Sequence, residues 1–159
     1  MKKILLIGCG HMGNALLDTW IKSNSYSVTI IDPIKYNVLK RKYKNKKINI
    51  IKNIQQLNKY VKFDFIVLAI KPYDLNNFLD ELVKIKLNNN ISLVSIIAGK
   101  KISLFENKLK NIKNFFRIMP NMPASIGESM NCVFSNKTAT TSSTKEVEKL
   151  FNYSGKTIF

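Results

Sequence analysis

The sequence predicts an α/β fold, in which a doubly wound and mostly parallel sheet carries helices on both faces. Short apolar or β-branched runs alternate with segments of helical periodicity along the whole chain. This alternation is typical of a parallel sheet whose strands are joined by right-handed helical crossovers. A glycine-rich turn also stands directly between the first predicted strand and the first predicted helix, at the end of the sheet where such folds bind ligands.

The start of the chain contains two predicted strand-helix pairs. Residues 3–7 form a short apolar run and predict a strand, and the apolar side chains of residues 12–21 recur at helical spacing. The β-branched segment SVTIID predicts a second strand that ends in Asp32. Pro33 suits the first turn of a helix, which we expect to continue to Arg41.

The middle of the chain contains the most apolar predicted strand. Residues 64–70, DFIVLAI, form a continuous apolar run of the kind that is buried on both faces of a parallel sheet, and Pro72 ends it. We expect Asp74 to cap the following helix, which would reach residue 85. Before this strand the sequence predicts a strand at INII and a short helix at IQQLNKYV, residues 48–51 and 54–61.

The last part of the chain continues the alternation. Strands are predicted at residues 91–97, 114–119 and 129–135 and from residue 156 onward. Helices are predicted at residues 102–109 and 145–153. We expect a capping box at the start of each helix, formed by Ser103 with Glu106 and by Ser143 with Glu146.

The composition is that of one globular domain with a strong positive charge. The 159 residues are 45% hydrophobic, and 26 Lys and Arg oppose 10 Asp and Glu, for a formal net charge of +16. Sites that read bases favour arginine, which occurs only at Arg41 and Arg117. We therefore expect no nucleic-acid partner, and no membrane partner because the apolar runs fall short of the roughly 18 residues that span a bilayer.

Cysteine and histidine are too few for several kinds of site. Cys9 and Cys132 are the only cysteines, and neither belongs to a pattern with metal-ligand spacing. One histidine cannot form a multi-histidine zinc site, so we expect no metal. The initial segment MKKILLIGC has too short an apolar run for a secretory signal, which needs roughly 7 to 15 residues. We expect a cytoplasmic protein.

Gly8, Gly10 and Gly13 form a complete G-x-G-x-x-G motif between a strand and a helix. In a Rossmann-type fold the first glycine permits a tight turn, the second lets the backbone approach a pyrophosphate, and the third packs helix against strand. The N-terminus of the helix adds N–H groups and a positive dipole. The motif predicts a dinucleotide-binding domain over residues 1–159, with a purely structural turn as the alternative.

Asp32 follows Gly13 at about the spacing of the acid that binds the adenosine ribose in such folds. A carboxylate there would repel the extra phosphate of NADPH, so NADH is favoured. Two alternatives stay open. Asp32 only turns the chain before Pro33, or the nearby Lys35 and Lys40 attract a phosphate.

Two side chains inside the glycine motif invite a chemical role. His11 belongs to the first turn of the predicted helix, where we expect it beside the cofactor and not in catalysis. Cys9 is a small residue in a tight turn, where a helix N-terminus would lower the pKa of its thiol. The sequence predicts no catalytic residue.

The segment FRIMPNMPASIG, residues 116–127, contains two of the four prolines, three positions apart. Each proline fixes its own φ and restricts the residue before it, so the pair stiffens a loop. This loop follows a predicted strand, and the carboxyl ends of parallel strands face one crevice. We expect the prolines to hold Asn121 where it hydrogen-bonds a nicotinamide, its ribose or a substrate, with a stiff surface connection as the alternative.

The segments GCGHMG, LAIKP, SIIAG and RIMPNMPASIGE resemble, in this order and over essentially the whole chain, the cofactor domain of pyrroline-5-carboxylate reductase. The resemblance implies hydride transfer from NAD(P)H to the C=N carbon of 1-pyrroline-5-carboxylate, the last step of L-proline biosynthesis. It also implies the cofactor-binding residues, which are Ile7, Gly8, Cys9, Gly10, His11 and Met12 at the pyrophosphate, Ala69, Ile70, Lys71, Pro72, Ile96, Ile97 and Ala98 at the ribose and nicotinamide, and Asn121 nearest the substrate.

Two features depart from the family pattern. Met122 and Ile97 stand where a threonine and a small alanine are usual, so packing around the nicotinamide should differ. Family members are also longer, with a C-terminal helical domain that forms the dimer and completes the substrate site. The resemblance therefore implies that residues 1–159 are the cofactor domain without that helical domain, monomeric or unstable, with weak or no turnover alone.

Three other functions stay open. Another imine or keto-acid reductase would share the cofactor domain, and assays with pyrroline-5-carboxylate and ketopantoate would separate the two. A non-catalytic dinucleotide-binding module would bind nucleotide without substrate-dependent oxidation. A nucleic-acid binder is suggested by the KRKYKNKK segment, which has little aromatic content and would have to show salt-sensitive retention of DNA or RNA.

Overall fold

A single mixed sheet forms the centre of the computed structural model, which describes residues 1–44, 46, 48–57 and 62–159. The strand order is β3-β2-β1-β4-β5-β6-β7-β8. Neighbouring strands are parallel except β6 and β7, which run antiparallel. This arrangement confirms the predicted Rossmann-type fold. The strands are β1 (Lys2–Ile7), β2 (Tyr26–Ile31), β3 (Ile48–Ile51), β4 (Phe65–Leu68), β5 (Ser92–Ser95), β6 (Asn114–Met119), β7 (Ser129–Ser135) and β8 (Gly155–Ile158).

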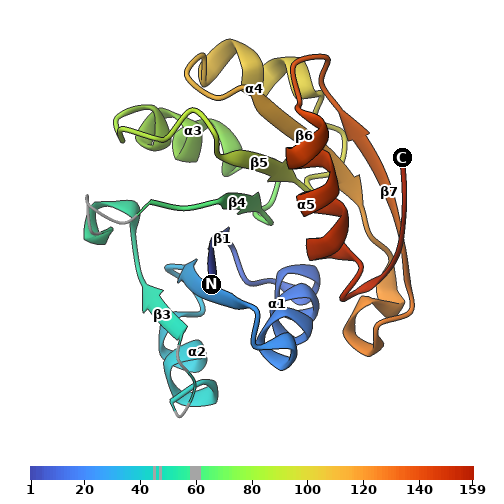
Figure 1. The fold of residues 1–159 in the computed structure, drawn as a ribbon. Coiled ribbons are helices and arrows are strands. Elements are labelled where there is room, and N and C mark those ends of the chain that lie inside the picture. Colours follow the sequence, from blue (N-terminus) through green and yellow to red (C-terminus); the bar gives the residue numbers. More distant parts are fainter. Residues whose placement is uncertain (45, 47, 58–61) are drawn as a thin grey trace.

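Helices cover both faces of the sheet (Figure 1). Side chains of α1 (His11–Ser23), α2 (Tyr36–Lys42) and α5 (Thr141–Phe151) belong to the core on one face, and those of α3 (Leu75–Val83) and α4 (Ile102–Lys108) to the core on the other. Two short 3-10 helices are η1 (Ile54–Gln56) and η2 (Met122–Ile126). In the part of the chain that the structure describes, no helix has the length and apolar character needed to cross a membrane.

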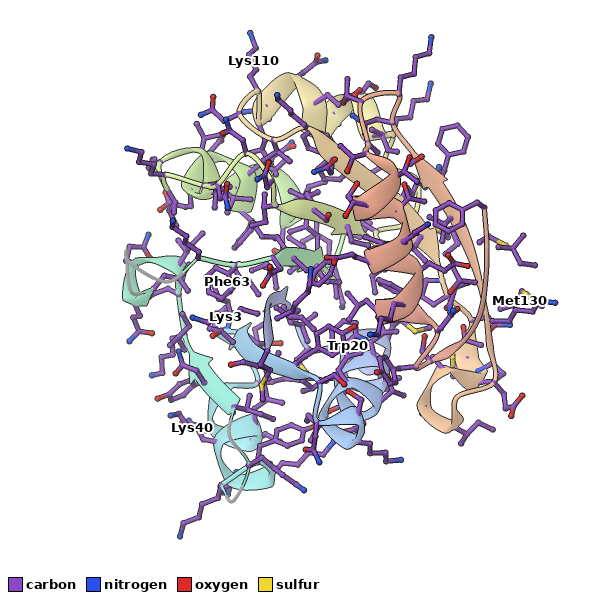
Figure 2. The ribbon with its side chains drawn as sticks, viewed as in Figure 1. Lys3, Trp20, Lys40, Phe63, Lys110 and Met130 are labelled. Atoms are coloured by element: carbon purple, nitrogen blue, oxygen red, sulfur yellow. The ribbon has the colours of Figure 1, made fainter. Side chains whose placement is uncertain are left out.

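Alternation along the strands explains the two cores. Ile4 and Leu6 of β1 face the core of α1 and α5, whereas Leu5 and Ile7 face the core of α3 and α4. Trp20 of α1 is labelled in Figure 2. Its ring packs edge-on against that of Phe151 on α5, with 6.0 Å between the ring centroids. This contact joins α1 to α5, and both helices pack in the same core against the sheet, which positions the N-terminus of α1.

The start of α5 differs from the prediction. Its cap is Thr140, whose hydroxyl oxygen accepts a hydrogen bond from the backbone N–H of Ser143. Ser143 is buried, and its own hydroxyl donates to Oδ1 of Asn114 at 3.1 Å. Glu146 pairs with Lys2 on β1. The predicted capping box of Ser143 and Glu146 is wrong because both side chains bind distant parts of the chain.

Of the other two predicted caps, one is wrong and one is right in position only. Ser103 lies inside α4, and Glu106 accepts a hydrogen bond from Nδ2 of Asn136 at 2.9 Å. Asp74 is the N-cap residue of α3, as expected, but its side chain makes no capping hydrogen bond. Of the helix predicted at residues 54–61, η1 forms at its start, and residues 58–61 lie outside the described residues.

The carboxyl ends of the parallel strands lie at one edge of the sheet. Ile7 at the end of β1 pairs with Ile31 of β2 and with Leu68 of β4. Leu68 in turn pairs with Ser95 of β5, and Ser95 with Arg117 near the end of β6. The segments that follow these strands therefore meet at this edge, where sheets of this kind bind ligands.

Candidate functional site

The glycine turn after β1 is packed so tightly that two of its glycines leave no room for a side chain. Gly8 has φ of 83°, and a Cβ there would lie 2.8 Å from the carbonyl oxygen of Ala69 and 2.9 Å from Cγ2 of Ile70. A Cβ on Gly13 would lie 2.6 Å from the carbonyl oxygen of Gly8. A Cβ on Gly10, by contrast, would have no atom of the described residues within 4 Å. The turn therefore has a closed inner side and an open outer side.

The N-terminus of α1 points its first N–H groups to this open side. Gly10 is the N-cap, in extended conformation and without a side-chain hydrogen bond, and the first turn contains no acidic residue. The 13-residue helix concentrates partial positive charge there, which favours a bound anion. The open backbone at Gly10 and the uncapped helix end together fit a pyrophosphate.

Asp32 lies directly after β2 and is buried, with 7% of its surface exposed. Its Oδ2 accepts a hydrogen bond from the N–H of Cys9 at 2.8 Å. Its Oδ1 accepts from the N–H groups of Ile34 at 3.0 Å and Lys35 at 2.8 Å. These last bonds form a turn after Pro33, so that α2 begins at Tyr36 and not at the proline as predicted.

A cavity of about 320 Å³ joins the glycine turn to η2. This volume is at the lower end of the range for small-molecule pockets. The residues that line it are Gly10, His11, Met12, Asn14, Ala15, Lys35, Met122 and Ser125. A second hollow, of about 290 Å³, is lined by residues of α5 and of the segment directly after it, namely Lys145, Glu148, Lys149, Asn152 and Tyr153.

The opposite side of the cavity belongs to the two-proline segment. Pro123 lies in the first turn of η2, and Gly127 ends it with φ of 80°. Asn121 is locked in place because its Oδ1 accepts from the N–H of Met130 at 2.9 Å and its own N–H donates to Oγ of Ser129 at 3.1 Å. The segment forms the short helix η2, and the side-chain carbonyl oxygen of Asn121 is used within the protein, by Met130.

Beneath Asn121 lies a buried polar relay. The Ser129 hydroxyl donates to Oδ1 of Asn131 at 2.9 Å, and Nδ2 of Asn131 donates to the carbonyl oxygen of Phe151 at 3.0 Å. Asn131 and Ser129 are both buried. The loop is thus tied to the end of α5 through hydrogen bonds, which the sequence pattern did not predict.

The remaining predicted residues separate into two groups. Ala69 and Ile70 contact the glycine turn, and the N–H of Ala69 donates to the carbonyl oxygen of Ile7 at 2.7 Å. The side chain of Ile97 is buried in the core of α3 and α4 and is not available to a ligand. The other members are partly or fully exposed after β4 and β5, namely Lys71, Pro72, Ile96 and Ala98.

Asn14, Ala15 and Ser125 line the cavity but were absent from the predicted site. For Asn14 and Ala15 a signal existed, since they follow His11 by three and four positions and so share its helix face. Asn14 is also held by α2, because Nζ of Lys42 donates to its Oδ1 at 2.9 Å. Nothing in the local sequence marks Ser125.

The chemistry of Cys9 differs from the expectation. Burial, and after it the neighbouring Asp32 carboxylate, raise the pKa of the Cys9 thiol to about 12. The positive end of α1 therefore does not produce a reactive thiolate. His11 is exposed at the mouth of the cavity, and the described residues contain no cluster of metal ligands.

Comparison with known proteins finds one family model and several reductases. Residues 3–99 match the model described as NADP oxidoreductase coenzyme F420-dependent. The pyrroline-5-carboxylate reductase of Escherichia coli (strain K12) is 31% identical over 159 residues, which cover 97% of this chain and 57% of that protein. The chain thus spans little more than half the length of this relative.

Solved structures show the same fold. The Plasmodium falciparum pyrroline carboxylate reductase with NADP bound is 26% identical with a TM-score of 0.80, over 99% of this chain and 56% of that one. A prephenate dehydrogenase from A. aeolicus has a TM-score of 0.81 at 16% identity, over 99% of this chain and 59% of that one. The second likeness shows the fold alone.

Proposed function

The chain belongs to the family described as NADP oxidoreductase coenzyme F420-dependent, and from this premise we propose that it binds NAD(P)H for the reduction of 1-pyrroline-5-carboxylate to L-proline. The observation that carries the proposal is the open backbone above Gly10 at the uncapped start of α1, facing a cavity whose other side is formed by Met122 and Ser125 of η2. Such a site suits a pyrophosphate, and the cavity extends from it toward a strand end.

Each side of the cavity has a separate task in this proposal. Gly10, His11 and Met12 would hold the pyrophosphate through backbone N–H groups, with Lys35 and Asn14 toward the adenosine. Asn121 would present its amide N–H₂ group to the nicotinamide or substrate, since its carbonyl oxygen is used by Met130. When bound, the cofactor supplies the hydride, and the protein contributes position and electrostatics.

The similar proteins are the reason to propose pyrroline-5-carboxylate as the substrate and not another imine or a keto acid. The reductases named for it are 26% and 31% identical to this chain, whereas the prephenate dehydrogenase is 16% identical. Another imine or keto-acid reductase is the second candidate, since an imine reductase from Bacillus cereus shares the fold at a TM-score of 0.74. The free cysteines Cys9 and Cys132 support a reducing, cytoplasmic setting.

Residues 1–159 form one dinucleotide-binding domain in this account, and turnover by these residues alone is weak or absent. The chain covers 57% of the E. coli relative, and the rest of that protein would supply the other part of the substrate site. A non-catalytic dinucleotide-binding module is the remaining alternative.

The test measures nucleotide oxidation and proline formation with NADPH or NADH. The purified chain is assayed with pyrroline-5-carboxylate or ketopantoate, alone and after addition of the part of the E. coli reductase outside the matched region. We expect proline only in the mixture. Rapid proline formation by the chain alone would refute the claim that these residues need the rest of the protein for turnover. Nucleotide oxidation with ketopantoate only would favour a keto-acid reductase. Nucleotide binding without oxidation in any mixture would favour a non-catalytic dinucleotide-binding module.

A further inference from the structure

We propose that the Asp32 carboxylate is a positioning group that braces the glycine turn and does not read the cofactor ribose, and that Lys35 instead decides cofactor choice in favour of the 2′-phosphate of NADPH. The proposal rests on the proposed function, because it concerns how the same site takes its dinucleotide. It reverses the expectation that an acid at position 32 selects NADH.

The brace is visible in the partners of Asp32. Its two oxygens accept hydrogen bonds from three backbone N–H groups, one on Cys9 and two on Ile34 and Lys35. A carboxylate has about four acceptor positions, and bonds from N–H groups to a charged acceptor are among the stronger ones. One buried side chain thus ties the glycine turn after β1 to the turn after β2.

The same partners leave little of Asp32 for a ribose. A ribose diol is recognised when two hydroxyl groups donate to one carboxylate, but both oxygens are already engaged and the side chain is 7% exposed. Turning the carboxylate outward would strip three backbone N–H groups of their acceptor. The cost of that step opposes ribose reading, chiefly at the N–H of Cys9, whose hydrogen bond is buried, because an unsatisfied buried donor is unfavourable.

Lys35 lies where it can determine the choice between NADPH and NADH. It lines the cavity together with Gly10, Asn14 and Ala15, on the side that the proposed function assigns to the adenosine. Among the described residues that line the cavity, none is acidic. The described ion pairs of lysines are formed by Lys2, Lys42, Lys84 and Lys108, which leaves Lys35 outside them. A lysine is a common point-charge partner of phosphate.

The first experiment compares affinities by titration calorimetry with NADPH, NADH, 2′,5′-ADP and 5′-ADP. We expect the unaltered chain to bind NADPH and 2′,5′-ADP more tightly than NADH and 5′-ADP. Lys35→Ala should weaken the binding of NADPH about tenfold and change the affinity for NADH by no more than about twofold. Lys40→Ala removes the same charge from a residue that does not line the cavity, and it should change neither the affinity for NADPH nor that for NADH. Equal binding of 2′,5′-ADP and 5′-ADP by the unaltered chain overturns the role of Lys35.

Asp32→Asn separates a brace from a ribose reader. If Asp32 is a brace, the affinities for NADH and NADPH fall by the same factor, so the ratio of the two affinities changes by no more than about twofold. A ribose reader predicts weaker NADH and tighter NADPH, a change of about tenfold or more in the ratio, and that result would overturn the proposal. Asp32→Ser is the second variant, because a serine hydroxyl keeps an acceptor for the turn of Ile34 and Lys35 while releasing Cys9.

The brace is also tested without any cofactor. Asp32→Asn should speed amide hydrogen exchange at Cys9, Ile34 and Lys35, by about tenfold at Cys9. The matched control is Asp64→Asn, which removes a carboxylate that accepts from the N–H of Lys3 at 2.8 Å, at the opposite end of β1. Unchanged exchange at Cys9 in the Asp32 variants would overturn the brace. If the unaltered chain binds no dinucleotide, the proposed function fails, and this exchange measurement still decides the brace.

Discussion

The two sides of the cavity are built in different ways. On one side the glycine turn is packed into the sheet, with Gly8, Cys9 and Asp32 buried. On the other side hydrogen bonds hold the backbone of Asn121, but the side chains of Met122 and Ile126 are 80% and 75% exposed. The shape of the first side therefore depends on packing within these 159 residues, whereas the second side has an ordered backbone and open side chains.

The largest effect should come from a side chain placed inside the packed turn. Gly8→Ala puts a Cβ 2.8 Å from a backbone oxygen at φ of 83°, so we expect a loss of about 2 to 4 kcal/mol in the free energy of unfolding. Gly10→Ala meets nothing within 4 Å and should cost about 1 kcal/mol or less. Denaturant unfolding measures both.

Dinucleotide binding then separates the two glycine variants further. Gly10→Ala should stay folded and lose most of its affinity for NADPH, because its methyl group would occupy the place of the pyrophosphate. An unaltered affinity in Gly10→Ala, or a stable Gly8→Ala chain, would remove the distinction between a packed inner side and an open outer side.

A second effect should appear beneath the other side of the cavity. Asn131→Ala removes a buried amide that bonds Ser129 and Phe151, so we expect a loss of about 2 to 3 kcal/mol in unfolding free energy. Asn121→Ala removes an exposed amide that serves Met130, and should cost about 1 kcal/mol. Asn76→Ala, on the exposed face of α3, is the control and should cost nothing measurable. Equal losses in the first two variants would argue that the relay does not support the loop.

A smaller effect is expected where side chains are open. Met122→Ser should change the free energy of unfolding by about 0.5 kcal/mol or less, because the side chain is exposed. It should nevertheless weaken dinucleotide binding several-fold, since Met122 lines the cavity. Ile126→Ser is equally exposed and does not line the cavity, so its affinity should match that of the unaltered chain. A binding loss of the same size in both variants would show a general effect of the segment.

The smallest effect concerns pH. The pKa of the Cys9 thiol is raised from 9.0 to about 12 by burial and by Asp32, so the unfolded chain loses this proton first. Its contribution to stability is fully present below pH 9 and is lost as the pH rises from 9 toward 12. Cys9→Ala should lose less stability over this range, measured by thermal unfolding. Burial also raises the pKa of Tyr26 and Tyr43, whose contributions remain in both proteins.

Much of the fold was predictable because burial leaves a strong local pattern. The predicted bounds of β3, β6 and β7 agree with the structure, since their runs of apolar or alternating residues fit strands in a sheet. The helix caps were not predictable in the same way. Ser143 and Glu146 resemble a capping box in sequence, but Asn114 and Lys2, distant along the chain, bind them instead.

The candidate site shows the same limit. The glycine turn was predictable, because the spacing of the glycines indicates directly where the backbone must carry no side chain. The behaviour of Asp32 was not, since its position after a strand suits a ribose ligand and a brace equally, and only the N–H groups of Cys9, Ile34 and Lys35 distinguish them. The contribution of Ser125 depends on η2 packing against α1, which is a tertiary contact.

One measurement tests the central claim most directly, namely a titration of the isotope-labelled chain with NADPH followed by backbone amide chemical shifts. The account predicts saturable shifts at residues 8–13 and 121–126, on the two sides of the cavity, with none around the second hollow, at Lys145 and Tyr153. Shifts confined to the second hollow, or no saturable shift at any concentration, would contradict it.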